Sequence, residues 1–314
     1  YKLPAAHYLV YENGHLTTQR YWDCDFEPKE QDFEACTQQL DETVHESVQA
    51  HRIADVKVGS FLSGGVDSSY ITACLMPDNT FSVGFDYHKF NETNYAAELS
   101  EKLGVTNYRK LLTAEECFDA FPDIQYHMDE PQSNPSSVPL YFLAKLAREH
   151  VTVVLSGEGA DEIFAGYEWY ADTPAMEKFK KVPRPVRRLA ADVAKKLPYF
   201  KGKNFLLKCS ERPEDYFMGQ ALVFPEKEAE AVLKPAYRVG PAPRALTDQV
   251  YARVKDQDEV TKKQYLDMNL WLPGDILLKA DKMCMAHSLE LRVPFLDKQV
   301  MEFAETIPTR YRIH

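Results

Sequence analysis

Residues 62–69 read LSGGVDSS and directly follow the apolar run VKVGSF at 56–61. Two glycines, three serines and an aspartate stand where a buried strand would otherwise continue. Glycine lets the backbone turn sharply, and a helix beginning near Asp67 would present bare N-terminal amides to an anion. The stretch therefore predicts a strand, an anion-binding turn and a helix. The alternative is an ordinary helix N-cap.

Asp67 indicates what such a turn would bind. A carboxylate beside a phosphate is repulsive unless a cation lies between them, and Mg²⁺ prefers one or two carboxylates together with phosphate oxygens. Ser63, Ser68 and Ser69 add hydroxyl donors. No Gly-Lys-Ser/Thr follows, so this is not a Walker loop. The sequence favours a phosphate site of another kind, with Asp67 as a magnesium ligand.

A second stretch, VTVVLSGEGADEIFAGY at 151–167, repeats this design. A β-branched strand leads to Ser156 and Gly157, and a helix is expected to begin near Asp161. Turns at the carboxyl ends of neighbouring parallel strands can face one ligand. Asp161 would then be a second magnesium ligand, and Glu158 would be placed for proton transfer. The structural alternatives are a helix N-terminal acid for Asp161 and a solvated loop acid for Glu158.

The segments around these turns indicate an α/β fold. A hairpin is expected within residues 1–25 with Asn13-Gly14 as its turn, and the chain after about 168 reads as helical without a convincing strand. Strands that alternate with helices are typical of βαβ units and a parallel sheet. The expected strands are 56–62, 80–85 and 151–155, and the expected helices are 29–53, 67–75, 93–103 and 139–150.

Composition and charge limit the classes of function. Hydrophobic residues make up 45% and charged residues 27% of the 314 residues, and no apolar run approaches the roughly 20 residues of a membrane span. Six scattered cysteines without zinc-type spacing fit a reducing cytoplasm. The net charge of −11 conceals a basic stretch at 178–208. Without an RNA-binding motif, that stretch is interpreted as a solvated helical subregion or a partner-facing patch rather than a nucleic-acid surface.

Residues 277–297, LLKADKMCMAHSLELRVPFLD, are expected to form one core helix that ends before Pro294. Lys279 is interpreted as a snorkelling side chain on this helix, and His287 as a structural or surface histidine. A buried polar network is the alternative for three charged residues near its end, Glu290, Arg292 and Asp297.

The motifs resemble those of a known family. SGGVDSS looks like the loop of the N-type ATP pyrophosphatases, and SGEGADEIFAGY resembles more specifically the glutamine-hydrolysing asparagine synthetases of the bacterial B type. The similarity continues through 129–150 and 277–297 and is weakest over 170–260. It implies a PP-loop fold like that of the adenine nucleotide α-hydrolases: a parallel five-stranded-type sheet flanked by helices, followed by a largely helical C-terminal half.

The resemblance also implies a reaction and a set of residue roles. ATP and Mg²⁺ would activate aspartate as β-aspartyl-AMP with release of pyrophosphate, and ammonia derived from glutamine would then form asparagine. Glu158 would be the acid/base partner of ammonia; the related β-lactam synthetases carry a tyrosine there. Leu62 and Val83 would line the adenine and ribose site, Ser63, Gly64, Gly65, Ser68 and Ser69 would hold pyrophosphate, Ser156 and Gly157 would touch AMP, and Asp67 and Asp161 would hold Mg²⁺.

The resemblance further implies how the chain is organised. Residues 1–28 would be the linker at the end of an N-terminal glutaminase domain, and residues 29–314 a C-terminally truncated synthetase domain. Glutaminase activity is therefore not expected of this chain. The expected enzyme is cytoplasmic, acts without nucleic acid or membrane, and leaves a homodimer open. The alternatives are a related amidotransferase, a β-lactam-synthetase-like ligase for another carboxylate, and an inactive nucleotide-binding fragment.

Overall fold

The structure is a computed structural model that describes residues 2–87, 91–130, 132–198, 200–220, 222, 224 and 226–313. The chain divides into two compact units. Unit 1 comprises Tyr1–Pro28, Glu162–Leu272 and Ile307–His314, and unit 2 comprises Lys29–Asp161 and Pro273–Thr306. Each unit is therefore assembled from segments that are distant in the sequence.

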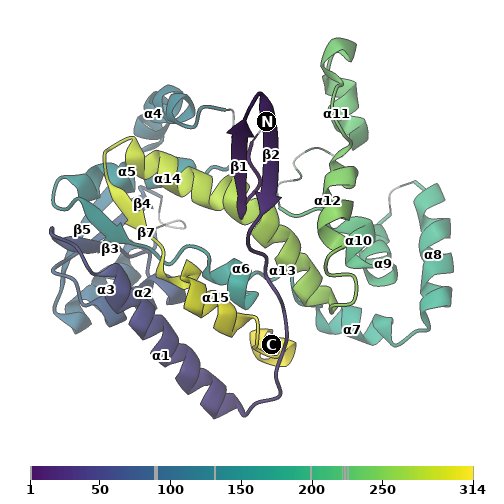
Figure 1. Ribbon diagram of the computed structural model, residues 1–314, viewed down its shortest axis with the longest axis horizontal. Coiled ribbons are helices and arrows are strands. Elements are labelled where there is room, and N and C mark those ends of the chain that lie inside the picture. Colours follow the sequence, from purple (N-terminus) through teal and green to yellow (C-terminus); the bar gives the residue numbers. More distant parts are fainter. Residues whose placement is uncertain are drawn as a thin grey trace. The chain divides into compact units, whose positions relative to one another are not determined.

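Unit 2 is built on a five-stranded sheet with the order β5-β4-β3-β6-β7 (Figure 1). Every neighbouring pair in this sheet is parallel. The chain moves outward from β3 to β4 and β5, and then returns to place β6 and β7 on the other side of β3. The topological switch point thus lies between β3 and β6, where ligands of such sheets bind. The strands are β3 Val58–Phe61, β4 Asn79–Phe85, β5 Thr106–Leu112, β6 Val153–Leu155 and β7 Glu290–Arg292.

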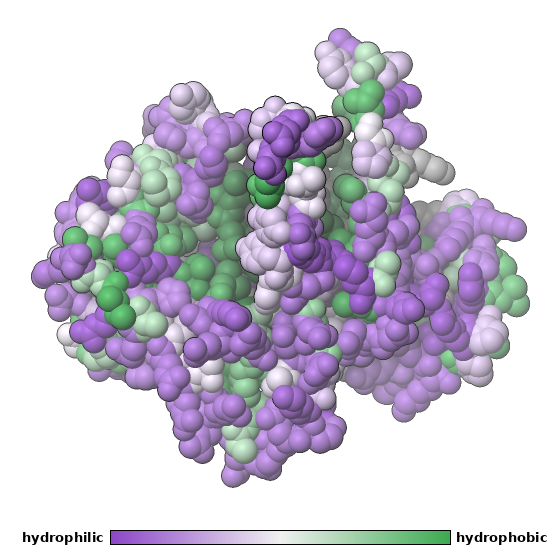
Figure 2. Space-filling model, viewed as in Figure 1, coloured by the Kyte–Doolittle hydropathy of each residue, from purple (hydrophilic) through white to green (hydrophobic). Residues whose placement is uncertain are grey.

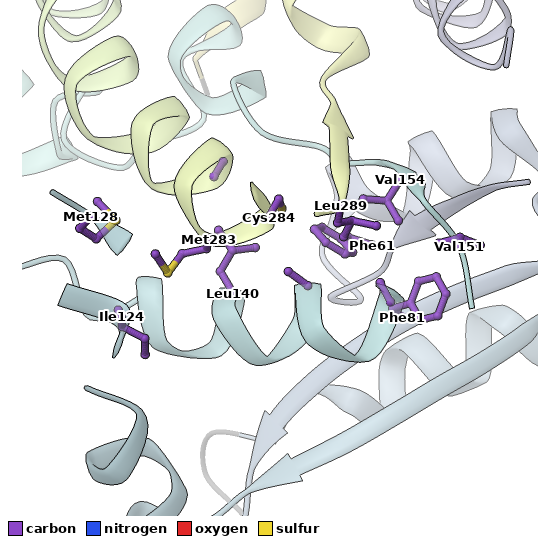
Figure 3. Packing of buried hydrophobic residues seen from close by; sticks show 13 residues of the cluster. Phe61, Phe81, Ile124, Met128, Leu140, Val151, Val154, Met283, Cys284 and Leu289 are labelled. Atoms are coloured by element: carbon purple, nitrogen blue, oxygen red, sulfur yellow. The ribbon is translucent and has the colours of Figure 1, made fainter. Parts of the chain in front are cut away.

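Helices pack around this sheet and bury its core. Helix α14 packs on α5, and Met283 of α14 belongs to the same buried cluster as Leu140 of α5 and Phe81 of β4 (Figure 3). Cys284 lies in this cluster, which makes it a core residue. The helices of this part of the chain are α1 Phe33–His51, α2 Val66–Leu75, α3 Thr93–Leu103, α4 Ala114–His127, α5 Ser137–Arg148, α6 Ala160–Phe164, the π-helix η3 Leu272–Ile276, α14 Leu277–Met285, the 3-10 helix η4 Pro294–Leu296 and α15 Lys298–Ala304.

Unit 1 combines an antiparallel hairpin with helices. The hairpin pairs β1 His7–Glu12 with β2 His15–Arg20, and its turn contains Asn13 (φ +51°) and Gly14 (φ +80°). The helices are α7 Pro174–Lys180, α8 Arg184–Lys196, α9 Lys203–Ser210, α10 Pro213–Tyr216, α11 Glu226–Val232, the 3-10 helix η2 Pro235–Tyr237, α12 Pro243–Tyr251, α13 Glu259–Asn269 and α16 Thr309–Arg312. The basic stretch 178–208 thus lies on α7, α8 and α9.

The surface agrees with the composition. Hydrophilic residues cover most of the face shown in Figure 2. Within the described part of the chain, no helix combines the length and the apolar character needed to cross a membrane.

The predicted fold class is confirmed, with two strands added. The expected strands at 56–62, 80–85 and 151–155 correspond to β3, β4 and β6. Strand β5 was not predicted, because its sequence, TNYRKLL, carries polar and charged residues at the edge of the sheet. The helix predicted from Leu277 to just before Pro294 is wrong beyond Met285, since Ser288 adopts a left-handed φ of +56° and β7 follows.

The polar network proposed for Glu290, Arg292 and Asp297 is also corrected. Arg292 donates through Nε to exposed Glu290 at 2.7 Å, and through Nη1 to the carbonyl oxygens of His51 and Ile53 at 2.7 and 2.8 Å. Asp297 instead caps α15 by accepting from the amide of Gln299 at 2.8 Å. Arg292 therefore ties β7 to the end of α1, whereas Asp297 stabilises the start of α15. Among the described residues, no hydrogen bond links Asp297 to Glu290 or Arg292.

Candidate functional site

The first glycine loop is pinned to the sheet at Leu62. The Leu62 amide donates to the carbonyl oxygen of Phe81 at 2.9 Å, and its carbonyl oxygen accepts from Ser82 Oγ at 2.6 Å. Leu62 is buried, and Val83, which follows Ser82 on β4, is partly buried. The two residues expected to line an adenine and ribose site thus lie on neighbouring strands, Leu62 directly after the end of β3 and Val83 within β4.

Beyond Leu62 the loop makes a compact turn into α2. Gly64 has a φ of +89°, and a Cβ there would lie 2.7 Å from Tyr95 Cβ, so this position requires glycine. The hydroxyl groups of Ser63 and Ser68 form a hydrogen bond across the turn, with 2.9 Å between their Oγ atoms. Gly65 is the N-cap of α2 and offers no side-chain hydrogen bond to it. The first amides of α2 are therefore not satisfied by a capping side chain, as an anion site requires.

The second glycine loop lies against the first. It follows β6, which pairs in parallel with β3. A Cβ at Gly157 would come within 2.9 Å of both the Asp67 Cβ and the Ser68 amide nitrogen. Only glycine allows this approach, so the structure brings the two loops that the sequence singled out into direct contact.

Two aspartates share this junction. Burial raises the pKa of Asp67, although its own backbone amide opposes the rise. Burial also raises the pKa of Asp161, and the negative charge of Asp67 raises it further. Among the described residues, neither carboxylate forms an ion pair, and no group of three or more His, Cys, Asp and Glu side chains could hold a metal ion. A pair of uncompensated carboxylates beside an anion loop fits Mg²⁺ that takes its remaining ligands from phosphate.

Glu158 lies on the second loop in a mixed electrostatic environment. The loop is anchored by the Ser156 amide, which donates to the Arg292 carbonyl oxygen at 3.0 Å. Burial raises the pKa of Glu158, the Lys279 ammonium lowers it, and Asp161 and Asp275 raise it again. A partly buried carboxyl with a raised pKa and a neighbouring cation has the properties of a general acid or base.

Sequence reasoning missed two residues from another segment, Asp275 and Lys279, whose charges act on the pKa of Glu158. Asp275 accepts hydrogen bonds from Gln132 and Asn134, and Lys279 donates to Ser136. These partners are separated by more than a hundred residues, so no local pattern could have paired them. The usable signal was the resemblance, which covered both 129–150 and 277–297. Lys279 is buried and hydrogen-bonded rather than snorkelling to solvent.

Two further residues singled out in the sequence, His287 and Ser69, lie in different surroundings. His287 is partly buried, and its ring centroid lies 4.4 Å from that of Tyr141, which agrees with a structural role. Ser69 lies in the first turn of α2, where its amide donates to the Gly65 carbonyl oxygen at 3.0 Å. Ser69 is thus held beside the other loop serines, while His287 belongs to the packing of α5.

Comparisons with known proteins decide the family. The profile of the asparagine synthase family matches residues 39–314. This chain belongs to the asparagine synthase family. Within that family, glutamine-hydrolyzing asparagine synthetase 1 of Bacillus subtilis (strain 168) is 38% identical over 310 residues, which cover 97% of this chain and 49% of that protein. A putative glutamine-hydrolyzing asparagine synthetase of Mycobacterium tuberculosis (strain CDC 1551 / Oshkosh) is 42% identical over 275 residues, covering 86% of this chain and 42% of that protein.

The chain spans about half the length of the curated asparagine synthetases that it matches. A solved structure of NMN synthetase from Francisella tularensis aligns with 84% of this chain and 98% of its own chain, but at a TM-score of 0.30 and 14% identity. That level of similarity supports no conclusion about function. The family assignment rests on the sequence matches.

Proposed function

We propose that this chain is the synthetase part of an ATP-dependent ligase that converts aspartate to asparagine. The observation that supports this most directly is the contact between the two glycine loops, with Asp67 and Asp161 close enough to repel each other. The family assignment supports the same reaction, because its curated members are named asparagine synthetases. In the intact protein a glutaminase domain would supply the ammonia, and the free cysteines of the described chain suit a cytoplasmic enzyme.

The first step would activate the substrate carboxylate. An aspartate side-chain oxygen attacks the α-phosphorus of ATP, so that the bond to the β-phosphate oxygen breaks and β-aspartyl-AMP and pyrophosphate form. Mg²⁺ held by Asp67 and Asp161 would oppose the negative charge that gathers in this step. The loop amides and serines Ser63, Ser68 and Ser69 would hold the pyrophosphate. Ser156 and Gly157 would contact AMP, and Leu62 and Val83 would line the adenine and ribose.

The second step would form the amide. Ammonia attacks the acyl carbon of β-aspartyl-AMP, and the Glu158 carboxylate accepts a proton from the attacking nitrogen. The tetrahedral centre then collapses, expels AMP and leaves asparagine. Glu158 must be ionised to act as this base, and the nearby Lys279 ammonium favours that form over the protonated one.

The test is to identify the acid that stimulates pyrophosphate release. The chain 1–314 and the full-length protein that contains it are each mixed with ATP, Mg²⁺ and ammonium, and a panel of carboxylic acids is added one at a time. Stimulation by aspartate alone, with asparagine as product, supports the proposal. Stimulation by another acid instead indicates a related amidotransferase or cyclising ligase. Nucleotide binding without pyrophosphate release under every condition contradicts the proposed activity.

A further inference from the structure

Two buried charged side chains of the η3–α14 segment form hydrogen bonds to a segment that is distant in the sequence. Asp275 in η3 and Lys279 in α14 lie one helical turn apart and are only 8% and 5% exposed. Asp275 Oδ1 accepts from Gln132 Nε2 at 2.7 Å, and its Oδ2 accepts from Asn134 Nδ2 at 2.5 Å. Lys279 Nζ donates to Ser136 Oγ at 2.8 Å. Segment 132–136, which leads into α5, is thus held at three points.

The hydrogen bonds in this cluster run in one consistent direction. An ionised carboxylate only accepts, so Asp275 fixes the amide nitrogens of Gln132 and Asn134 toward itself. Asn134 Oδ1 is then free to accept from the Ser136 amide at 3.0 Å and from Ser136 Oγ at 2.7 Å. Ser136 Oγ in turn accepts from Lys279. A chain of hydrogen bonds therefore runs from the Lys279 ammonium through the Ser136 hydroxyl and the Asn134 amide to the Asp275 carboxylate. Because this chain begins at a cation and ends at an anion, its groups polarise one another and each bond is strengthened.

Two further features mark this cluster as more than packing. Asp275 lies in a π-helical turn, a rare geometry that occurs frequently at functional sites. Because Gln132 Nε2 is committed to Asp275, its Oε1 is held in place as a buried acceptor, and no described residue donates to it. A buried acceptor without a protein partner calls for an explanation such as a ligand donor or water.

The cluster lies on the helix that leads into β7, the strand to which the Glu158 loop is anchored by the hydrogen bond from the Ser156 amide to the Arg292 carbonyl oxygen. The charges of Lys279 and Asp275 both act on the pKa of Glu158, the first lowering it and the second raising it. No such influence from either residue acts on Asp67, whose pKa responds to burial and to its own amide. The charges of the cluster therefore act on Glu158 and not on Asp67.

We propose that Asp275 is a positioning residue that, together with Lys279, fixes segment 132–136 as one wall of the Glu158 site. We call the three hydrogen bonds from Asp275 and Lys279 to segment 132–136 the clamp. Its assignment to the amide-forming step rests on the proposed function. The clamp serves this second step, and the activation of the carboxylate on the first glycine loop does not depend on it.

The experiment compares Asp275→Asn with Asp281→Asn, an exposed acid on α14, in the full-length protein. Hydrogen–deuterium exchange is followed in peptides covering 132–140 and 62–69. In parallel, aspartate-dependent pyrophosphate release and ammonia-dependent asparagine formation are measured. The Asp275→Asn protein should exchange roughly 10- to 100-fold faster over 132–140 only, and lose asparagine formation by a similar factor while pyrophosphate release persists. Asp281→Asn should match the wild type in all four measurements.

Each contrary result is decisive for one part of the proposal. Unchanged exchange over 132–140 in a folded Asp275→Asn protein overturns the clamp. Equal losses of pyrophosphate release and asparagine formation overturn its assignment to the second step. If Asp275→Asn does not fold, Ser136→Ala interrupts the same cluster without removing a buried charge, and the same two criteria apply to it. A wild-type protein that releases no aspartate-dependent pyrophosphate contradicts the proposed function, while the exchange data still decide the clamp.

Discussion

The buried charged side chains of unit 1 differ from the two aspartates at the glycine loops of unit 2 in how they are satisfied. In unit 1, α13 is buried along nearly its whole length, and Lys263 Nζ donates to the carbonyl oxygens of Trp169 and Tyr170 at 3.1 and 3.2 Å. Arg312 in the same unit donates to Gln264 Oε1 and to Thr261 Oγ1. These charges are stabilised by protein acceptors. In unit 2, Asp161 is instead placed where the negative charge of Asp67 disfavours its ionised form.

The difference indicates how a site can be told from a polar core. Burial of charge alone does not mark function, because unit 1 buries charge and satisfies most of it internally. The glycine loops of unit 2 combine uncapped amides with like charges that the described protein groups do not neutralise. Such an arrangement is stabilised only when ligands bring the missing charges. Four substitutions test this contrast, in order of decreasing effect.

Asp67→Asn should produce the largest loss. Removal of one carboxylate from the pair weakens the proposed magnesium site, and we expect Mg²⁺-dependent pyrophosphate release to fall by roughly 10³-fold or more. The matched control is Asp267→Asn, which neutralises a buried aspartate of unit 1. If both substitutions reduced pyrophosphate release equally, the contrast between the two units would be broken.

Glu158→Gln should reduce asparagine formation by roughly 10²-fold or more, because general-base catalysis is lost, while ATP binding is retained. In the wild type, burial raises the pKa of Glu158, so the rate of amide formation should decline with falling pH before an ordinary glutamate would protonate. The measurement is the pH profile of asparagine formation from ammonia, beside nucleotide titration. Equal damage to nucleotide binding would make Glu158 a nucleotide ligand instead.

Asp267→Asn should change stability rather than activity. Burial raises the pKa of Asp267 to about 6, although the Tyr170 hydroxyl donates to it at 2.8 Å. A carboxyl whose folded pKa is raised destabilises the fold as pH increases from about 4 through 6, and the cost is constant above that. The variant should therefore gain up to about 3 kcal/mol at pH 8 and nothing near pH 4. Denaturant unfolding at both pH values checks this, with exposed Asp256→Asn as control; a gain that is equal at both pH values would contradict it.

Gly157→Ala should have the smallest effect of the four, about 1–3 kcal/mol of stability, because its Cβ would press on Asp67 Cβ and on the Ser68 amide. Nucleotide affinity should fall with it, since the two loops must separate. Gly274→Ala is the control, because a Cβ there meets nothing within 4 Å. Thermal unfolding with and without ATP gives both quantities. Equal behaviour of the two variants would show that contact between the loops is unimportant.

The sequence predicted what is encoded locally and missed what is encoded at long range. Strand–glycine–helix patterns located both loops, and the helix expected over 93–103 is α3, which Gly104 closes with a φ of +69°. The Asp275 cluster could not be foreseen, because its partners come from segments that only the fold brings together. Helix α13 reads as polar and solvent-exposed in the sequence, yet tertiary packing covers Lys262, Lys263 and Asp267. Short strands such as β7 carry too few residues to show a period.

The position of β7 in the chain has a consequence for biosynthesis. Strand β6 ends at Leu155, but β7, its neighbour on the side away from β3, begins only at Glu290, after most of unit 1 has been translated. At ordinary ribosome speeds this interval lasts on the order of ten seconds. During that time the nascent sheet has an open edge beside β6, and α5 lacks the cover of α14. A chain truncated within unit 1 would therefore keep an unpaired sheet edge that can pair with another chain.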